Sequence, residues 1–213
     1  MAKGDETRAA ILTRAFELAN VIGVSGLTIG RLAEATGLSK SGLFAHFGSK
    51  EALEVAVVEE AARQFVQEVM VPALGQPRGE PRVRALYEHW MKWGERDGGC
   101  FFVGASAELD DRPGAPRDAL VRANKDWIDA ITTAAQIAIT EGHFRSDLDA
   151  RQFAFELYGI MLAAHTFGRF LHERGTKGRT RDAFERLLDA ARPDPARPPH
   201  PVRPARSGPR PDS

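Results

Sequence analysis

The chain has 213 residues, with 29 Lys and Arg against 29 Asp and Glu, and a single cysteine. This length suffices for a sizeable core in one or two domains, one cysteine excludes an intrachain disulfide, and zero net charge provides no overall excess of cations for nucleic acid. Neither a signal-peptide pattern nor an apolar run long enough to span a bilayer is present, so we expect a cytoplasmic protein with no membrane partner. Glycine-rich phosphate loops, paired-cysteine metal motifs and nucleophile elbows are also missing, so the sequence supports no enzyme, cofactor or metal site.

The first fifty residues predict three helices. An amphipathic helix is expected over residues 5–22 and is ended by a glycine. Thr28 is an N-cap type of residue before a short second helix that ends at Gly37, and Ser39 caps a third. Residues 28–47 thus have the order helix, tight glycine turn, helix, which is typical of a helix-turn-helix motif.

The third of these helices has two different faces. One face is apolar and suits a small core, with Leu43, Phe44 and Phe47. The other is small, polar and cationic, with Lys40, Ser41, Ala45 and His46. A face of this kind suits the DNA major groove, which admits a helix and lets short side chains approach the bases. Just beyond, Lys50 and free backbone amides share a helix N-terminus, which favours phosphate binding.

The stretch TRAAILTRAFELANVIGVSGLTIGRLAEATGLSKSGLFAHFGSKEAL, residues 7–53, resembles the N-terminal domain of the TetR family of bacterial transcriptional regulators. The resemblance implies an all-α protein in which residues 1–50 form a DNA-binding head, and residues 51–191 form a helical body for effector binding and dimerisation. It also implies a dimeric repressor that binds a palindromic double-stranded operator and is released when a small molecule makes the linking helices move the heads apart. The DNA-facing positions that it implies are Thr28, Lys40, Ser41, Gly42, Phe44 and His46, with Lys50 on phosphate. The family usually has Tyr where this chain has Phe44, so the phosphate hydrogen bond of that hydroxyl is lost and core packing of the ring stays open.

Helical periodicity continues after residue 50, and no segment alternates like a strand. A long linking helix is expected to stop before Pro72. Further helices are expected at residues 82–96, 101–109, 115–141, 149–174 and 180–191. Residues 192–213 are rich in proline and arginine and poor in large apolar side chains, so this tail is predicted to be disordered.

The body concentrates bulky rings on the helices that adjoin the linking helix. Small-molecule sites are mostly apolar and aromatic, so these rings are candidate effector contacts: Trp90, Trp93, Phe101, Phe102 and Trp127. Ordinary core packing is the alternative for each of them. The sequence therefore predicts an apolar or aromatic effector.

The helix near residues 153–172 is apolar over too wide an arc for a surface helix. A two-fold helical interface would bury this arc, and Leu157, Met161 and Ala164 are the candidate interface residues. A central helix of a monomer remains the alternative.

Two other function classes stay open. A thiol at a helix start could have a lowered pKa, so Cys100 could serve a redox sensor, although a small buried hydrophobe is the simpler interpretation. A DNA-binding activator or architectural protein without an effector would carry the same motif. The sequence favours a ligand-responsive repressor over both.

Overall fold

The computed structural model describes residues 3–194, with side chains described from Thr7 onward. The regular elements of the described chain are all helices, and no strand occurs among them, as the sequence predicts. The elements are α1 (Lys3–Ile22), α2 (Ile29–Thr36), α3 (Lys40–Phe47), α4 (Lys50–Phe65), the π-helical turn η1 (Val66–Met70), α5 (Val71–Leu74), α6 (Glu80–Trp93), α7 (Phe101–Leu109), α8 (Ala115–Thr140), α9 (Ala150–His165), the π-helical turn η2 (Thr166–Phe170) and α10 (Thr176–Ala191). The predicted tail falls almost wholly on residues 195–213, which lie outside the described part.

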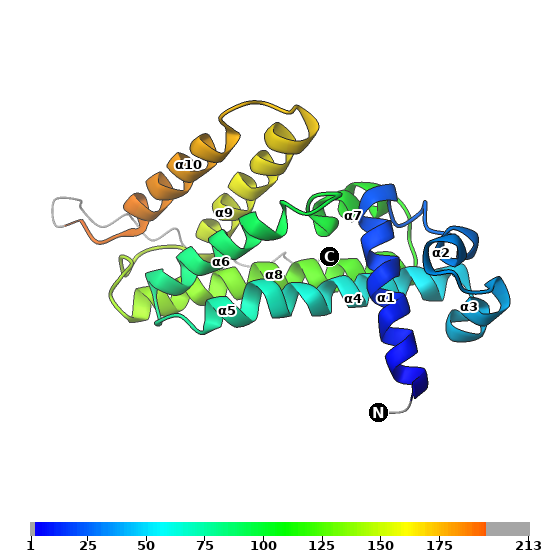
Figure 1. Ribbon diagram of the computed structural model, residues 1–213. Helices are drawn as coiled ribbons and strands as arrows, with labels where there is room; N and C mark the ends of the chain where they lie inside the picture. The colour runs from blue at the N-terminus through cyan, green and yellow to red at the C-terminus, as the bar shows by residue number, and fades with distance from the viewer. Residues whose placement is uncertain (1–2, 195–213) are drawn as a thin grey trace, which may run out of the picture.

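The first three helices gather at one end of the molecule, and α4 leads from them into the body beside α8 (Figure 1). The small core of this head comes from inward positions of each helix, including Phe16, Leu32, Leu43 and Phe47. The body continues with α6 and α7 packed on α8, while α9 and α10 form a helical hairpin (Figure 1). One hydrophobic core runs through head and body, so the two parts share buried contacts.

The linking helix passes Pro72 instead of stopping before it, and this corrects the sequence prediction. Proline lacks the N–H of an i→i−4 bond, and its ring crowds the preceding turn. The chain widens into η1 just before it, where the Val71 N–H bonds to the Val66 carbonyl five residues back. Pro72 then lies in the first turn of α5, where a missing N–H costs little.

The C-terminal helices also differ from the prediction. The helix expected over residues 149–174 consists of α9 and the π-helical turn η2 that continues it, and it ends at Phe170, before a short connection. Gly175 has φ 82°, in the left-handed region that glycine favours, and α10 starts directly after it, four residues earlier than expected. At the other end, Arg192 is anchored to Glu80 at 2.5 Å, so the first residue of the predicted tail is held in place.

Candidate functional site

The helix-turn-helix is set by side-chain caps that are local in sequence. The Thr28 hydroxyl accepts the N–H of Arg31 at 3.1 Å at the start of α2. The Ser39 hydroxyl accepts the N–H of Gly42 at 3.1 Å at the start of α3. Gly37 between them has φ 69°, which permits the sharp corner. These contacts fix the angle between α2 and α3, and hence the direction in which α3 presents its outer face.

The outer face of α3 is exposed as the sequence predicts. Its predicted DNA-facing residues Lys40, Ser41, Gly42, Phe44 and His46 are all exposed. Leu43 and Phe47 on the opposite side are buried in the head. The ring of Phe44 is 57% exposed, so it belongs to the outer face and the core-packing alternative for it is wrong.

Two lysines flank this face at helix starts. The Lys40 side chain lies close to Gly30 in the first turn of α2, where free backbone amides gather. The Lys50 ammonium donates to the carbonyl of Ser25 at 2.9 Å and lies 3.5 Å from the carboxylate of Glu54. Lys50 is thus exposed but already bonded to the loop between α1 and α2.

That same loop is attached to the body by Glu108, on the last turn of α7. The Glu108 carboxylate accepts the backbone N–H of Val24 at 2.8 Å and that of Ser25 at 2.5 Å. Arg112, just past α7, bonds the Ser25 hydroxyl. Hydrogen bonds to a charged acceptor are about twice as strong as neutral ones, so Glu108 joins the body firmly to the segment that enters the helix-turn-helix.

A second contact between head and body is aromatic. The Phe16 ring of α1 lies 6.0 Å from that of Trp93 and 5.6 Å from that of Phe101. The Arg96 guanidinium lies 3.5 Å from the centre of the Trp93 ring. The Asn20 amide also donates to the Gly99 carbonyl at 3.1 Å. Trp93 and Phe101, predicted as effector contacts, therefore fill this junction because Phe16 packs against them.

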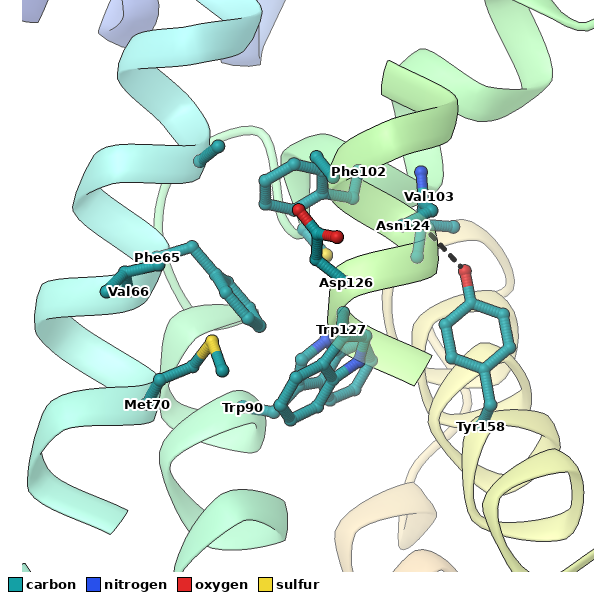
Figure 2. A pocket seen from close by; sticks show the side chains of 13 residues that line it. Phe65, Val66, Met70, Trp90, Phe102, Val103, Asn124, Asp126, Trp127 and Tyr158 are labelled. Carbon is teal, nitrogen blue, oxygen red and sulfur yellow. Dashed lines mark hydrogen bonds between the residues drawn. The ribbon is translucent and has the colours of Figure 1, made fainter. Parts of the chain in front are cut away.

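The other three predicted rings do line a cavity. Trp90, Phe102 and Trp127 surround a space of about 60 Å³ between α4, α6, α7, α8 and α9 (Figure 2). The remaining wall is mainly apolar, with Phe65, Met70, Val66, Val103, Ala62 and Ala123. This volume exceeds that of a single water, but it is well below the ~300–1,000 Å³ of sites for drug-sized ligands.

A few polar groups also reach the cavity. The Tyr158 hydroxyl donates to the Asn124 side chain at 3.2 Å, and burial raises the pKa of Tyr158. The Trp127 indole N–H is buried without a hydrogen-bond partner in the described part of the chain. Asp126 completes the wall from α8, and Figure 2 shows its carboxylate directed from α8 toward α4, beside Phe102. The described lining of the cavity is thus mainly aromatic and apolar, with one carboxylate, that of the exposed Asp126.

Two family models match the chain. The model described as bacterial regulatory proteins, tetR family, matches residues 11–57, which include all of α2 and α3. The model described as tetracyclin repressor-like, C-terminal domain, matches residues 79–184. The head and the body therefore match an N-terminal and a C-terminal model of the same family, in that order along the chain. The chain belongs to the TetR family of bacterial transcriptional regulators.

Solved structures agree with this membership. A TetR-family regulator from Cytophaga hutchinsonii is 22% identical with a TM-score of 0.81, covering 90% of this chain and 98% of its own. A TetR regulator from Chloroflexus aurantiacus J-10-FL is 29% identical with a TM-score of 0.78, covering 89% and 96%. AibR in complex with isovaleryl coenzyme A and operator DNA is 23% identical with a TM-score of 0.66, covering 86% and 99%. No curated protein sequence matches the chain.

The lone cysteine of this TetR-family chain lies in the cavity wall. Cys100 is 1% exposed, and burial raises the pKa of its thiol to about 11. The lowered pKa that a helix start could provide is therefore not found, because the loss of solvation outweighs the two backbone N–H groups near the sulfur. At neutral pH Cys100 is a protonated, buried thiol, which argues against a thiol sensor.

The predicted dimer residues need correction. Leu157, Met161 and Ala164 are 0%, 0% and 8% exposed within one protomer, so they face its core. They share an inward face because residues three and four apart lie together on a helix. The outward face of α9 and η2 carries a different set of exposed apolar side chains, namely Phe155, Leu162, Phe167 and Phe170.

Some candidate residues of this TetR-family chain were missed by sequence reasoning. Glu108 and Asn20 contact partners more than seventy residues away, and an isolated glutamate or asparagine gives no local signal. Phe65 and Asp126 were not among the predicted site residues either, and both line the cavity. The described part of the chain contains no group of three or more His, Cys, Asp or Glu arranged to hold a metal, and none of its helices is both long and apolar enough to cross a bilayer.

Proposed function

We propose that the protein is a homodimeric repressor that binds a palindromic operator with α3 of each subunit and releases it when a small molecule occupies the aromatic cavity. The observation that carries the DNA part is the division of α3. Its apolar side is fixed in the head, while Lys40, Ser41, Gly42, Phe44 and His46 are free to meet DNA. Two-fold related heads would read two half-sites about one helical turn apart.

The control by a ligand is supported by the position of α7. Its first turn contributes Phe102 and Val103 to the cavity, and its last turn holds the α1–α2 loop through Glu108. One short helix therefore touches both places. A ligand that fits the cavity better in one orientation of α7 would shift the population of head orientations, as differential affinity requires. AibR, solved with both a small molecule and operator DNA, is a precedent of the same fold.

The proposal of a dimer rests on the outward face of α9. Phe155 is 72% exposed and Leu162 is 36% exposed, and both lie on the side of the helix that also holds Gly159. A Cβ added to Gly159 would meet nothing within 4 Å, so this side is open to a partner helix. Exposed apolar patches of this kind mark interfaces in soluble proteins.

The DNA part is tested by selecting an operator from a random duplex library and measuring its affinity for the Lys40→Ala variant by fluorescence anisotropy. Loss of a phosphate or base contact in each subunit should weaken binding by at least tenfold, about 1.4 kcal/mol in total. Lys92→Ala, an exposed lysine on α6, is the matched control and should bind as the unmodified protein does. Equal binding by both variants would contradict the proposed contact of α3 with DNA. If the selection yields no operator sequence, the proposal of a repressor is overturned.

The dimer is tested by sedimentation of Phe155→Glu beside Leu74→Glu, which places the same charge at an exposed leucine on α5. We expect the first variant to sediment as a monomer and the second as a dimer. In a two-fold interface the introduced glutamates of the two subunits would lie close together, and their like charges would repel each other. A Phe155→Glu protein that remains dimeric would move the interface away from this face of α9.

Control by an effector is tested by a ligand screen that records tryptophan fluorescence and operator affinity in the same samples. Trp90 and Trp127 line the cavity, so occupancy should change the emission. Compounds that bind there should weaken operator binding by roughly 5–150-fold, the range of ordinary allosteric coupling. Ligands that bind without altering operator affinity would favour the class of regulators without an effector.

A further inference from the structure

The cavity combines aromatic rings with a single carboxylate and has no basic group among its described lining residues. We propose that its ligand is a small organic cation with a quaternary ammonium head. This proposal rests on the proposed function, because it names the class of effector for the same site. It differs from the apolar or aromatic effector that the sequence predicts.

Aromatic rings from several helices line the space. Phe65 of α4 meets Phe102 and Trp127 edge to face, with ring centroids 5.3 and 4.9 Å apart and planes at 79° and 80°. Trp90 of α6 and Tyr158 of α9 complete the aromatic wall. Aromatic faces carry negative potential and attract an alkylammonium group within about 6 Å, with tryptophan the strongest.

The charge of the wall points to a cation as well. Asp126 has no hydrogen bond or ion pair within the described part of the chain, whereas Asp129, one turn later on α8, pairs with Arg151 at 2.7 Å. The cation at the nearby Trp93 junction, Arg96, is held by Glu68 at 2.5 Å. The only charged group among the described lining residues is therefore the Asp126 carboxylate, which is exposed to solvent at the edge of the cavity, and a cationic ligand would lie beside it.

The size of the space fits one head group. A group the size of a water molecule occupies about 10–15 Å³ of cavity volume. The cavity of about 60 Å³ therefore accommodates roughly four to six groups of this size. A trimethylammonium group with its methylene carbon has five heavy atoms. An ammonium with free N–H groups would need several acceptors here, and apart from Asp126 the cavity offers few. A methylated nitrogen has no such need.

The experiment compares choline with 3,3-dimethyl-1-butanol, in which carbon replaces the charged nitrogen at almost unchanged shape. Both are titrated into the full-length protein by calorimetry, without DNA. We expect choline to bind about tenfold more tightly or better, since only the cation gains from the ring faces and from Asp126. Asp126→Asn should reduce this preference about fivefold while leaving the affinity for the neutral compound unchanged. Asp129→Asn, with the same charge change on the same helix, should keep the preference.

A Trp90→Leu variant separates the rings from the carboxylate. It retains an apolar wall but loses a π face, so it should weaken choline binding by about tenfold and affect the alcohol less. A thermal melt shows whether this variant is folded. Equal or tighter binding of the alcohol, or no binding of either compound, would overturn the cation proposal. Choline binding that Asp126→Asn leaves unchanged would overturn the role of the carboxylate.

Operator affinity, measured with each compound, distinguishes this proposal from the function on which it rests. Choline that binds but does not weaken operator binding would contradict control by an effector while leaving the ligand class intact. The alcohol binding more tightly and releasing the operator would contradict the ligand class while leaving the function intact. Binding of choline together with operator release supports both.

Discussion

Replacement of Glu108 by Ala should loosen the head from the body without disturbing the cavity. The carboxylate accepts two backbone N–H bonds, and one of the donors, Val24, is 1% exposed. Hydrogen bonds to charged groups contribute about 1.5–3 kcal/mol each, and the half-buried carboxylate argues for the low end of that range. Loss of both bonds should therefore cost about 3 kcal/mol. Glu108→Gln keeps an acceptor oxygen and should cost about half as much.

Hydrogen exchange followed by mass spectrometry measures this effect element by element. A change of about 3 kcal/mol accelerates exchange by about 10²-fold, and we expect it in the α1–α2 loop and α2 while α8 is unaffected. Glu88→Ala, an exposed carboxylate on α6, serves as the matched control. Uniform acceleration across head and body would show that Glu108 supports the global fold, and less than threefold acceleration in the loop would refute the argument from the two bonds.

Three further outcomes are expected. Lys50→Ala should lower the slope of log affinity against log salt by about two, one released counterion for each subunit, and an unchanged slope would leave Lys50 with only its contacts to Ser25 and Glu54. Cys100 should react with iodoacetamide at pH 7 on the order of 10²-fold more slowly than in urea, because a thiol with its pKa raised to about 11 is rarely ionised, and equal rates would contradict its burial. The hydrogen bond from Arg192 lowers the pKa of Glu80 below its ordinary value of 4.5. The ion pair therefore contributes its full stabilisation of the folded state above pH 4.5, and this contribution is lost as the pH falls through the pKa that Glu80 has in the folded protein. Arg192→Ala should therefore shift the acid unfolding of α10, measured by hydrogen exchange, to higher pH. An unchanged transition pH would show that the Glu80–Arg192 ion pair does not stabilise α10.

Features set by neighbouring residues were predictable from the sequence. The caps at Thr28 and Ser39 and the corner at Gly37 depend on contacts within a few residues, and each is found where expected. The exposed face of α3 follows from the same spacing. The all-helical body follows from periodicity, although its boundaries shifted where a π turn allowed the chain to pass Pro72.

Features set by distant residues were not predictable. Five bulky rings looked equivalent in the sequence, but Trp93 and Phe101 pack on Phe16 of the head while the others line the cavity. The apolar arc of α9 was recognised, yet only the fold shows that Leu157 faces inward and Phe155 outward. Periodicity identifies which residues share a face, and the tertiary packing decides what that face meets.

Because α4 is a continuous helix, a small tilt at its cavity end produces a larger displacement at its other end, next to the head. From Lys50, beside the outer face of α3, to Phe65, in the cavity wall, the helix spans fifteen steps, or about 22 Å at 1.5 Å each. A tilt of roughly 10° about the cavity end would carry the Lys50 end through about 4 Å by this geometry. In a two-fold dimer the separation of the heads could change by about twice that amount, against a half-site spacing of about 34 Å. A ligand of only a few atoms could therefore change the separation of the two heads so that it no longer matches the spacing of the half-sites, because the length of α4 amplifies the displacement.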